Sequence, residues 1–231
     1  MEFLKNEFFL VAITLGLYHL FKLLQQKVGW LILNPILLTI CALILFIQLT
    51  GIEYDDYQKA GEQIDFWLKP AVVALGVPLY LQLKTIRKQI VPILLSQLVG
   101  CIVGIISVVW TSHLLGASKE VVISLASKSV TTPIAMEISQ QIGGIPSLTA
   151  AVVVITGILG AMIGYKILHI SFVKNPISQG LSMGTAAHAV GTSASMELSA
   201  RYGAFSSLGL ILNGILTAAL TPYLLSWMGF L

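Results

Sequence analysis

The feature that most constrains this chain is a set of long apolar stretches without a single Asp, Glu, Lys or Arg. Four of them are long enough to cross a bilayer as helices, and they cover residues 31–49, 89–118, 138–165 and 202–231. A spanning helix rises about 1.5 Å per residue and needs about 20 apolar residues. The sequence therefore predicts an all-α polytopic membrane protein.

The composition excludes other classes of protein. Only 10% of the residues are charged and 56% are hydrophobic, with a net charge of +3, whereas soluble domains carry about 25% charged residues. A soluble domain, a disordered chain and a nucleic-acid binder are all excluded, because each needs more charge. No motif of an intramembrane enzyme and no Cys/His spacing of a metal site occurs. We expect no enzyme, cofactor or metal.

Two weaker stretches complete a prediction of six full spans. Residues 8–24 are apolar up to Lys22, and residues 67–83 are shorter and contain Pro70 and Pro78, which predicts a kinked helix. Asn34 and Pro35 interrupt the span at 31–49, and a kink is the favoured interpretation there.

Two further segments, 119–139 and 175–200, are too apolar for ordinary loops and too polar for contact with lipid. Irregular backbone at membrane depth is tolerated only where protein or a water-filled cavity satisfies its polar groups. Ser118 and Asn175, each directly before one segment, are typical helix starts. We expect the functional chemistry in these two segments.

The same two segments belong to an internal repeat. Residues 128–148 (KSVTTPIAMEISQQIGGIPSL) align without a gap on residues 188–208 (HAVGTSASMELSARYGAFSSL), with identical residues that include Met136/Met196 and Glu137/Glu197. Chance similarity is the alternative in a chain that uses so few residue types. Hydrophobic segments that are interrupted by Gly or Pro, and that occupy corresponding positions in two repeats, are typical of the binding site of a transporter.

The distribution of basic residues favours one orientation of this repeat. If the odd segments are re-entrant hairpins, the two copies are inverted, with eight basic residues on the cytoplasmic side and four outside; if the segments cross, the copies are parallel and the count is six against six. The positive-inside rule favours the hairpins. It also predicts that both termini lie outside.

The predicted turns of the hairpins carry hydroxyl groups, in Ser129–Pro133 and in Gly191–Ser195. Free backbone N–H groups of two half-helices that meet near the midplane could bind a small carboxylate, with Thr132 as the cap before Pro133. A tight turn without a ligand is the alternative. The candidate substrate-binding residues are Lys128, Ser129, Thr131, Thr132, His188, Gly191, Thr192 and Ser193.

Each candidate hairpin also carries a cation and a carboxylate nine residues apart. Lys128 precedes Glu137, and His188 precedes Glu197 at the same interval, so antiparallel arms would bring the members of each pair together. Ionisable residues within a bilayer are candidates for function. The two glutamates are predicted either to couple a proton or ion or to act as structural latches between the arms.

Several motifs resemble the LrgB/CidB family of bacterial membrane proteins. They are KSVTTPIA (128–135), GGIPSLTA (143–150), TGILGA (156–161) and GTAAHAVGT (184–192), with NP, YDDYQKAG and KPAVVALGVPLY upstream. The resemblance covers nearly the whole chain. It implies a location in the bacterial inner membrane and a small LrgA/CidA-type membrane partner.

The resemblance implies two functions. One is holin-like or antiholin-like modulation of murein hydrolase activity and cell lysis; the other is transport of small monocarboxylates of the pyruvate, glycolate or glycerate class, as in the related LrgB-like half of the plastid glycolate/glycerate transporter. Duplicated, broken segments with buried charges are costly unless they bind something, which favours transport. We therefore expect an elevator-like, homodimeric secondary transporter with a scaffold at 1–117 and a core at 118–231, whose repeats are 118–170 and 175–231.

Overall fold

The computed structural model describes residues 2–30, 33–74 and 76–231, and all the regular elements among these residues are helices. Four described helices are long and apolar enough to cross a membrane, α1 (Glu7–Val28), α6 (Ile90–Leu114), α9 (Pro146–Ile170) and α11 (Ala200–Trp227). The prediction of an all-helical protein is confirmed. The chain divides into two compact units, Met1–Gly76 and Val77–Leu231.

The first unit contains a short 3-10 helix, η1 (Glu2–Lys5), and the helices α1, α2 (Pro35–Thr50) and α3 (Tyr54–Ala74). The side chain of Asn6 caps α1, and the left-handed Gly29 ends it. Leu10, Ile52 and Ala60 form the buried apolar cluster of this unit.

Polar contacts hold α3 against the start of α1. Lys5 Nζ lies 2.7 Å from Asp56 Oδ2, and Gln63 Nε2 donates to Glu7 Oε2 over 2.8 Å. The hydrogen bond from Lys5 lowers the pKa of the Asp56 carboxyl. These charged side chains give α3 the character of a helix in contact with water.

Two predicted spans differ from the structure. Asn34 caps α2, and Pro35 is the first residue of this helix of 16 residues. The pair therefore begins a helix and does not kink a longer one. Residues 31 and 32 of the predicted span lie outside the described residues. The predicted span at 67–83 is divided between the end of α3 and α4 (Gly76–Leu81), with residue 75 outside the described residues. Four of the described helices are long and apolar enough to cross a membrane, so six full spans are not confirmed.

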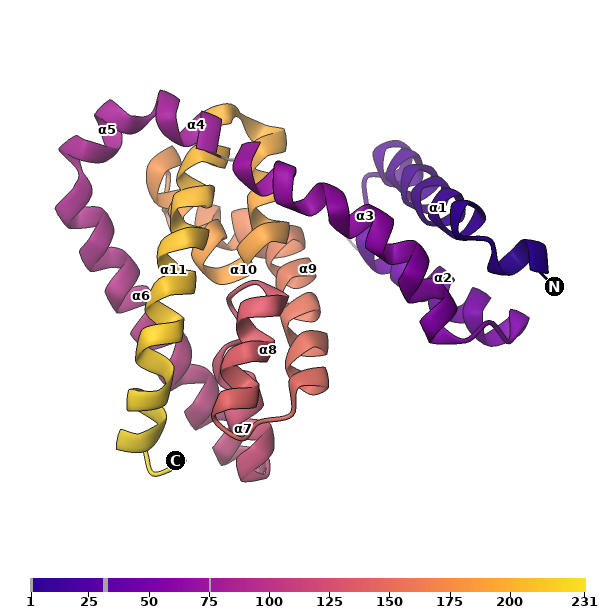
Figure 1. Cartoon of the computed structure of the whole chain (residues 1–231). Helices are drawn as coiled ribbons and strands as arrows, with labels where there is room; N and C mark the ends of the chain where they lie inside the picture. Colours follow the sequence, from indigo (N-terminus) through magenta and orange to yellow (C-terminus); the bar gives the residue numbers. More distant parts are fainter. Residues whose placement is uncertain (1, 31–32, 75) are drawn as a thin grey trace. The chain divides into compact units, whose positions relative to one another are not determined.

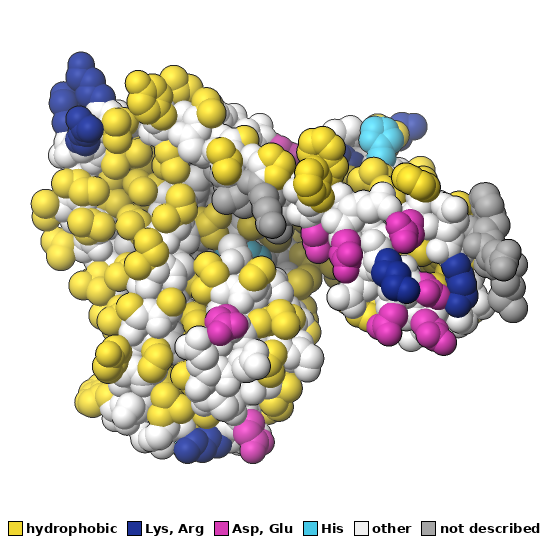
Figure 2. All heavy atoms as spheres, viewed as in Figure 1, with side chains coloured by type: hydrophobic (Ala, Val, Ile, Leu, Met, Phe, Trp, Pro, Cys, Tyr) yellow, Lys and Arg dark blue, Asp and Glu magenta, His cyan; other side chains and the backbone are white. Residues whose placement is uncertain are grey.

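The second unit holds α5 (Leu83–Lys88), α6, α7 (Lys119–Ala126), α8 (Thr132–Gln141), α9, α10 (Pro176–Leu198) and α11. Figure 1 shows α7 and α8 in the lower half of this unit and α10 in the upper half. Hydrophobic side chains cover most of the visible face of the unit, as Figure 2 shows, and residues such as Val103, Ile155 and Ile215 are more than half exposed. This surface suits contact with lipid.

The helices α7 and α8 form a hairpin, called the first hairpin below. Ser118 is the N-cap residue of α7, as predicted. Both arms contact the start of α9, since the amide of Ile145 donates to Ser124 Oγ over 2.7 Å and Thr149 Oγ1 donates to Ser139 Oγ over 2.8 Å. The base of this hairpin therefore lies at the N-terminal end of α9.

The helix α10 also folds back on itself, and its two arms are called the second hairpin. Asn175 caps α10, as predicted. The backbone departs from helical geometry at Ala187 and at His188, whose φ of 42° is left-handed. Met183 before this break contacts Gly164 of α9, and Ser195 after it accepts a hydrogen bond of 2.7 Å from Tyr165. Residues on both arms thus lie beside the same turn of α9, so the chain reverses at the break.

The turns of the two hairpins meet near the middle of α9. Val130 in the turn of the first hairpin is buried with Val153 of α9. In the turn of the second hairpin, Nε2 of His188 lies 2.9 Å from the carbonyl oxygen of Val153. The ring of His188 packs against Gly157. The two hairpins therefore approach one point of α9 from its opposite ends.

The predicted span at 138–165 begins too early. Its first residues complete α8, and α9 begins only at Pro146. Gly143, with a φ of 81°, turns the chain between the two helices, and Pro146 suits the first turn of α9. The residues that separate these helices, 142–145, carry no charge, so counting charges does not reveal the boundary.

Candidate functional site

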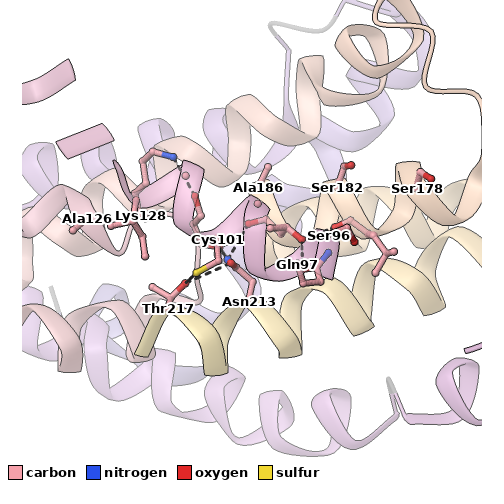
Figure 3. Close-up of a pocket in the computed structure, with 16 residues that line it drawn as sticks. Ser96, Gln97, Cys101, Ala126, Lys128, Ser178, Ser182, Ala186, Asn213 and Thr217 are labelled. Carbon is pink, nitrogen blue, oxygen red and sulfur yellow. Dashed lines mark hydrogen bonds between the residues drawn. The ribbon is translucent and has the colours of Figure 1, made fainter. Parts of the chain in front are cut away.

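A cavity of about 360 Å³ lies in the second unit where the turn of the first hairpin meets α6, α11 and the first arm of α10. Figure 3 shows the side chains that line it. They are mostly small, hydroxyl-bearing or amide-bearing: Ser96, Gln97, Gly100, Cys101, Gly104, Ile105, Ala126, Lys128, Ser129, Ser178, Leu181, Ser182, Thr185, Ala186, Asn213 and Thr217.

Lys128 gives the cavity its charge. Among the residues that line the cavity it is the one charged side chain. Its ammonium donates to Ser129 Oγ over 3.1 Å, and the side chain is half-buried. A cation in such surroundings is costly unless an anion accompanies it. The lining therefore favours a ligand with a negative charge.

Neutral polar groups complete the lining. Thr185 Oγ1 lies 2.6 Å from Gln97 Oε1 and 2.7 Å from the carbonyl oxygen of Leu181, so its one hydroxyl proton has two acceptors within reach. Thr217 Oγ1 lies 3.4 Å from Cys101 Sγ, and Figure 3 shows these two side chains beside Asn213. The cavity can thus offer hydrogen bonds to a small polar ligand from several directions.

Two of the predicted substrate-binding residues, Lys128 and Ser129, line this cavity. Thr131 and Thr132 are half-buried at the start of α8 and are absent from the lining. Thr131 is the N-cap residue of α8 and Thr132 its first residue, so the cap and the helix start one position earlier than predicted. Pro133 remains in the first turn, as expected.

The structure gives the predicted residues of the second hairpin other surroundings. His188 and Thr192 are buried, and Thr192 Oγ1 contacts the His188 carbonyl oxygen and Ser206 Oγ at 2.9 and 3.0 Å. Gly191 is buried where a Cβ would press on the Met183 carbonyl oxygen, and Ser193 is exposed. His188, Gly191 and Thr192 pack the second hairpin, and none of the four residues lines the described cavity.

The turn of the second hairpin also lies four residues earlier than predicted. The sequence predicts it at Gly191–Ser195, but the chain reverses at Ala187 and His188. Gly191 instead permits the two arms to approach each other closely, because no side chain fits between it and Met183.

The structure does not bring Lys128 and Glu137 together. Glu137 is exposed and accepts a hydrogen bond of 2.9 Å from Gln141, while Lys128 bonds to Ser129. Glu197 is exposed, whereas the ring of His188 is buried against α9. A coupling role for either glutamate stays a prediction.

The sequence analysis missed Asn213 and Gln97, which are buried and line the cavity. Each is an amide inside a long apolar stretch, and a buried amide needs hydrogen-bond partners. An isolated amide in a predicted spanning helix was the sequence signal that could have identified these two residues as part of a polar site. Ser178, Ser182 and Thr185 line the cavity because they recur along one face of the first arm of α10.

Four of the described helices are long and apolar, and together with an internal polar cavity they define a multi-pass helical membrane protein. The chain belongs to the LrgB-like family, whose model matches residues 14–227. This is not a family of known enzymes. The resemblance found in the motifs is confirmed.

Similar proteins match over nearly their full length. The chain is 34% identical to the holin-like protein CidB of Staphylococcus epidermidis over 216 residues, 94% of each protein. It is 36% identical to the uncharacterised protein YwbG of Bacillus subtilis (94% of this chain, 96% of YwbG) and 36% identical to an uncharacterised protein of Haemophilus influenzae (90% and 91%). No solved structure is significantly similar to the chain.

Proposed function

We propose that this protein is a secondary transporter of small monocarboxylates of the pyruvate, glycolate or glycerate class. The observation that carries the proposal is the cavity whose single charged lining residue is Lys128. Binding cavities start at about 300 Å³, so 360 Å³ suits a small ligand with a few waters. The ammonium would bind the carboxylate, and the hydroxyl and amide groups would bind the remaining polar atoms.

The contacts of the hairpins support an inverted repeat in this proposal. The 60-residue offset that aligns Lys128 with His188 also aligns Val153 of α9 with Asn213 of α11. His188 contacts the Val153 carbonyl, and Asn213 donates to the carbonyl of Ser129, beside Lys128. Each turn thus contacts the long helix of the other repeat at the equivalent residue. This is the pattern of two re-entrant hairpins that enter from opposite faces.

The proposed transporter has residues 1–117 as its scaffold and 118–231 as its moving core. The cavity then lies between α6, on the scaffold side, and the two hairpins with α11, on the core side. Substrate at such a boundary is expected for an elevator-like mechanism. We further propose a homodimer in the bacterial inner membrane that works with a small LrgA/CidA-type protein and has both termini outside.

Uptake into liposomes tests the proposed function. The purified full-length protein, with and without an LrgA/CidA-type partner, should take up labelled pyruvate, glycolate or glycerate above the rate of empty liposomes. Excess unlabelled substrate should compete, and a neutral analogue of the same size should not. The absence of uptake of all three substrates in both preparations would refute the proposal.

Labelling of single cysteines tests the proposed orientation. In a background with Cys41→Ser and Cys101→Ser, Lys119→Cys lies at the base of the first hairpin and Lys174→Cys lies directly before the second, and both positions are exposed. An impermeant maleimide added to whole cells should label position 119 and should reach position 174 only after the membrane is permeabilised. Labelling of both positions from outside would contradict hairpins from opposite faces.

A holin-like modulator of lysis is the second candidate, and the name of the CidB relatives favours it. This function predicts that expression increases dye leakage and autolysis. A transporter does not require these effects. If leakage persists when Lys128 is replaced, lysis modulation does not depend on the cavity.

A further inference from the structure

One side chain joins the two hairpins beside the cavity. Asn213 lies in the middle of α11 with 2% of its surface exposed. Its Nδ2 donates to the carbonyl oxygen of Ser129 over 3.1 Å and to the carbonyl oxygen of Thr185 over 3.0 Å. Ser129 belongs to the turn of the first hairpin, and Thr185 precedes the break of the second.

Both carbonyl groups lie where the regular helical hydrogen-bond pattern is interrupted. The residue four positions after Ser129 is Pro133, which has no N–H. The residue four positions after Thr185 is Ala189, and the break at Ala187 and His188 lies between the two. Each hairpin therefore presents a backbone carbonyl group to Asn213 at the place where its chain turns.

An asparagine suits this position for a chemical reason. The carboxamide carries two N–H groups on one nitrogen, so it can reach two acceptors at once. A hydroxyl group has one donor, and an ionised carboxylate has none. Since Asn213, Ser129 and Thr185 all line the cavity, the same two bonds determine where Lys128 and Ser129 lie relative to the first arm of α10.

We propose that Asn213 is a positioning residue that clamps the two hairpins together and so holds the binding cavity in its substrate-binding geometry. The inference rests on the proposed function for its effect on substrate. The clamp itself is a property of the fold. Loss of the carboxamide separates the turns of the hairpins and weakens the binding of a carboxylate.

The distance between the hairpins tests the clamp directly. Spin labels at Ile134→Cys and Ala189→Cys, both exposed and close to the turns, report this distance by double electron–electron resonance in the Cys41→Ser, Cys101→Ser background. The distribution should be narrow with Asn213 present. It should broaden with Asn213→Leu, which removes both donors, and with Asn213→Asp, which keeps the shape but cannot bridge two acceptors.

Thr221→Val is the matched control. Thr221 is fully buried on the same helix, but its hydroxyl donates to the Thr217 carbonyl within α11 and does not reach either hairpin. The distribution should stay narrow in this variant. A broad distribution in the protein with Asn213, or a narrow one in either Asn213 variant, would overturn the clamp.

Equilibrium binding of labelled pyruvate to the detergent-solubilised protein tests the effect on the cavity. The Kd should rise at least tenfold in Asn213→Leu and should be unchanged in Thr221→Val. Broadened distances with an unchanged Kd would overturn the positioning role. If the unsubstituted protein binds no pyruvate, glycolate or glycerate, the proposed function fails, while the distance measurement still decides whether Asn213 clamps the hairpins.

Discussion

Lys128→Met is expected to reduce uptake of pyruvate into liposomes by roughly 10- to 100-fold. The substitution keeps an unbranched apolar side chain and removes the charge. A hydrogen bond that involves a charged group contributes about 1.5–3 kcal/mol, and about 1.4 kcal/mol corresponds to a tenfold change in binding. Because Lys128 is the one charged residue among those that line the cavity, no neighbouring cation can replace it there.

The stability of the same variant separates a binding effect from a folding effect. A half-buried cation at membrane depth is costly without a counter-ion, so Lys128→Met should unfold at the same temperature as the unsubstituted protein or at a higher one. Lys119→Met is the control, because Lys119 is exposed at the base of the same hairpin and does not line the cavity. Full uptake by Lys128→Met, or equal losses in both variants, would contradict the proposed site.

Gly184→Ala is expected to destabilise the second unit strongly. A Cβ at Gly184 would overlap the carbonyl oxygen of Ser206 and lie 2.9 Å from the amide nitrogen of Leu210. Both are backbone atoms of α11, so no side chain can rotate away. Overpacking of this kind costs about 1–3 kcal/mol, and we expect thermal unfolding to begin roughly 2–4 °C lower for each kcal/mol.

Gly16→Ala is the matched control for this prediction. Gly16 lies in α1, and a Cβ there would have no neighbour within 4 Å. Alanine is the better helix former, so this variant should be as stable as the unsubstituted protein or slightly more stable. An unchanged unfolding temperature for Gly184→Ala would show that α10 and α11 can move apart without cost.

The parts of the fold that depend on residues close together in the sequence could be predicted from the sequence. Asn175 is a helix start because its side chain accepts a hydrogen bond from the amide of Ile177, only two residues away. Ser118 occupies the N-cap position of α7 without such a bond. The long apolar helices were recognisable because lipid requires uninterrupted apolar residues. The boundary between α8 and α9 was not, since the residues that separate them carry no charge.

The candidate site was predicted only in part, because most of its walls come from residues that are far apart in the sequence. Lys128 and Ser129 stood out as polar residues in an apolar segment, and they line the cavity. The other walls come from α6, α10 and α11, which meet only in the folded chain. His188 turns the chain through a left-handed backbone conformation that histidine rarely adopts, so the glycine at 191 was the more natural residue for a turn.

The contacts at the base of the first hairpin have a consequence for the biosynthesis of the protein. Ser124 and Ser139 find partners in Ile145 and Thr149, which leave the ribosome after both arms of the hairpin. Until α9 enters the membrane, Ser124 has only its bond to the Glu120 carbonyl within α7, Ser139 lacks the bond from Thr149, and lipid replaces neither missing contact. We therefore expect the nascent hairpin to wait in the aqueous insertion channel and to partition into the bilayer together with α9.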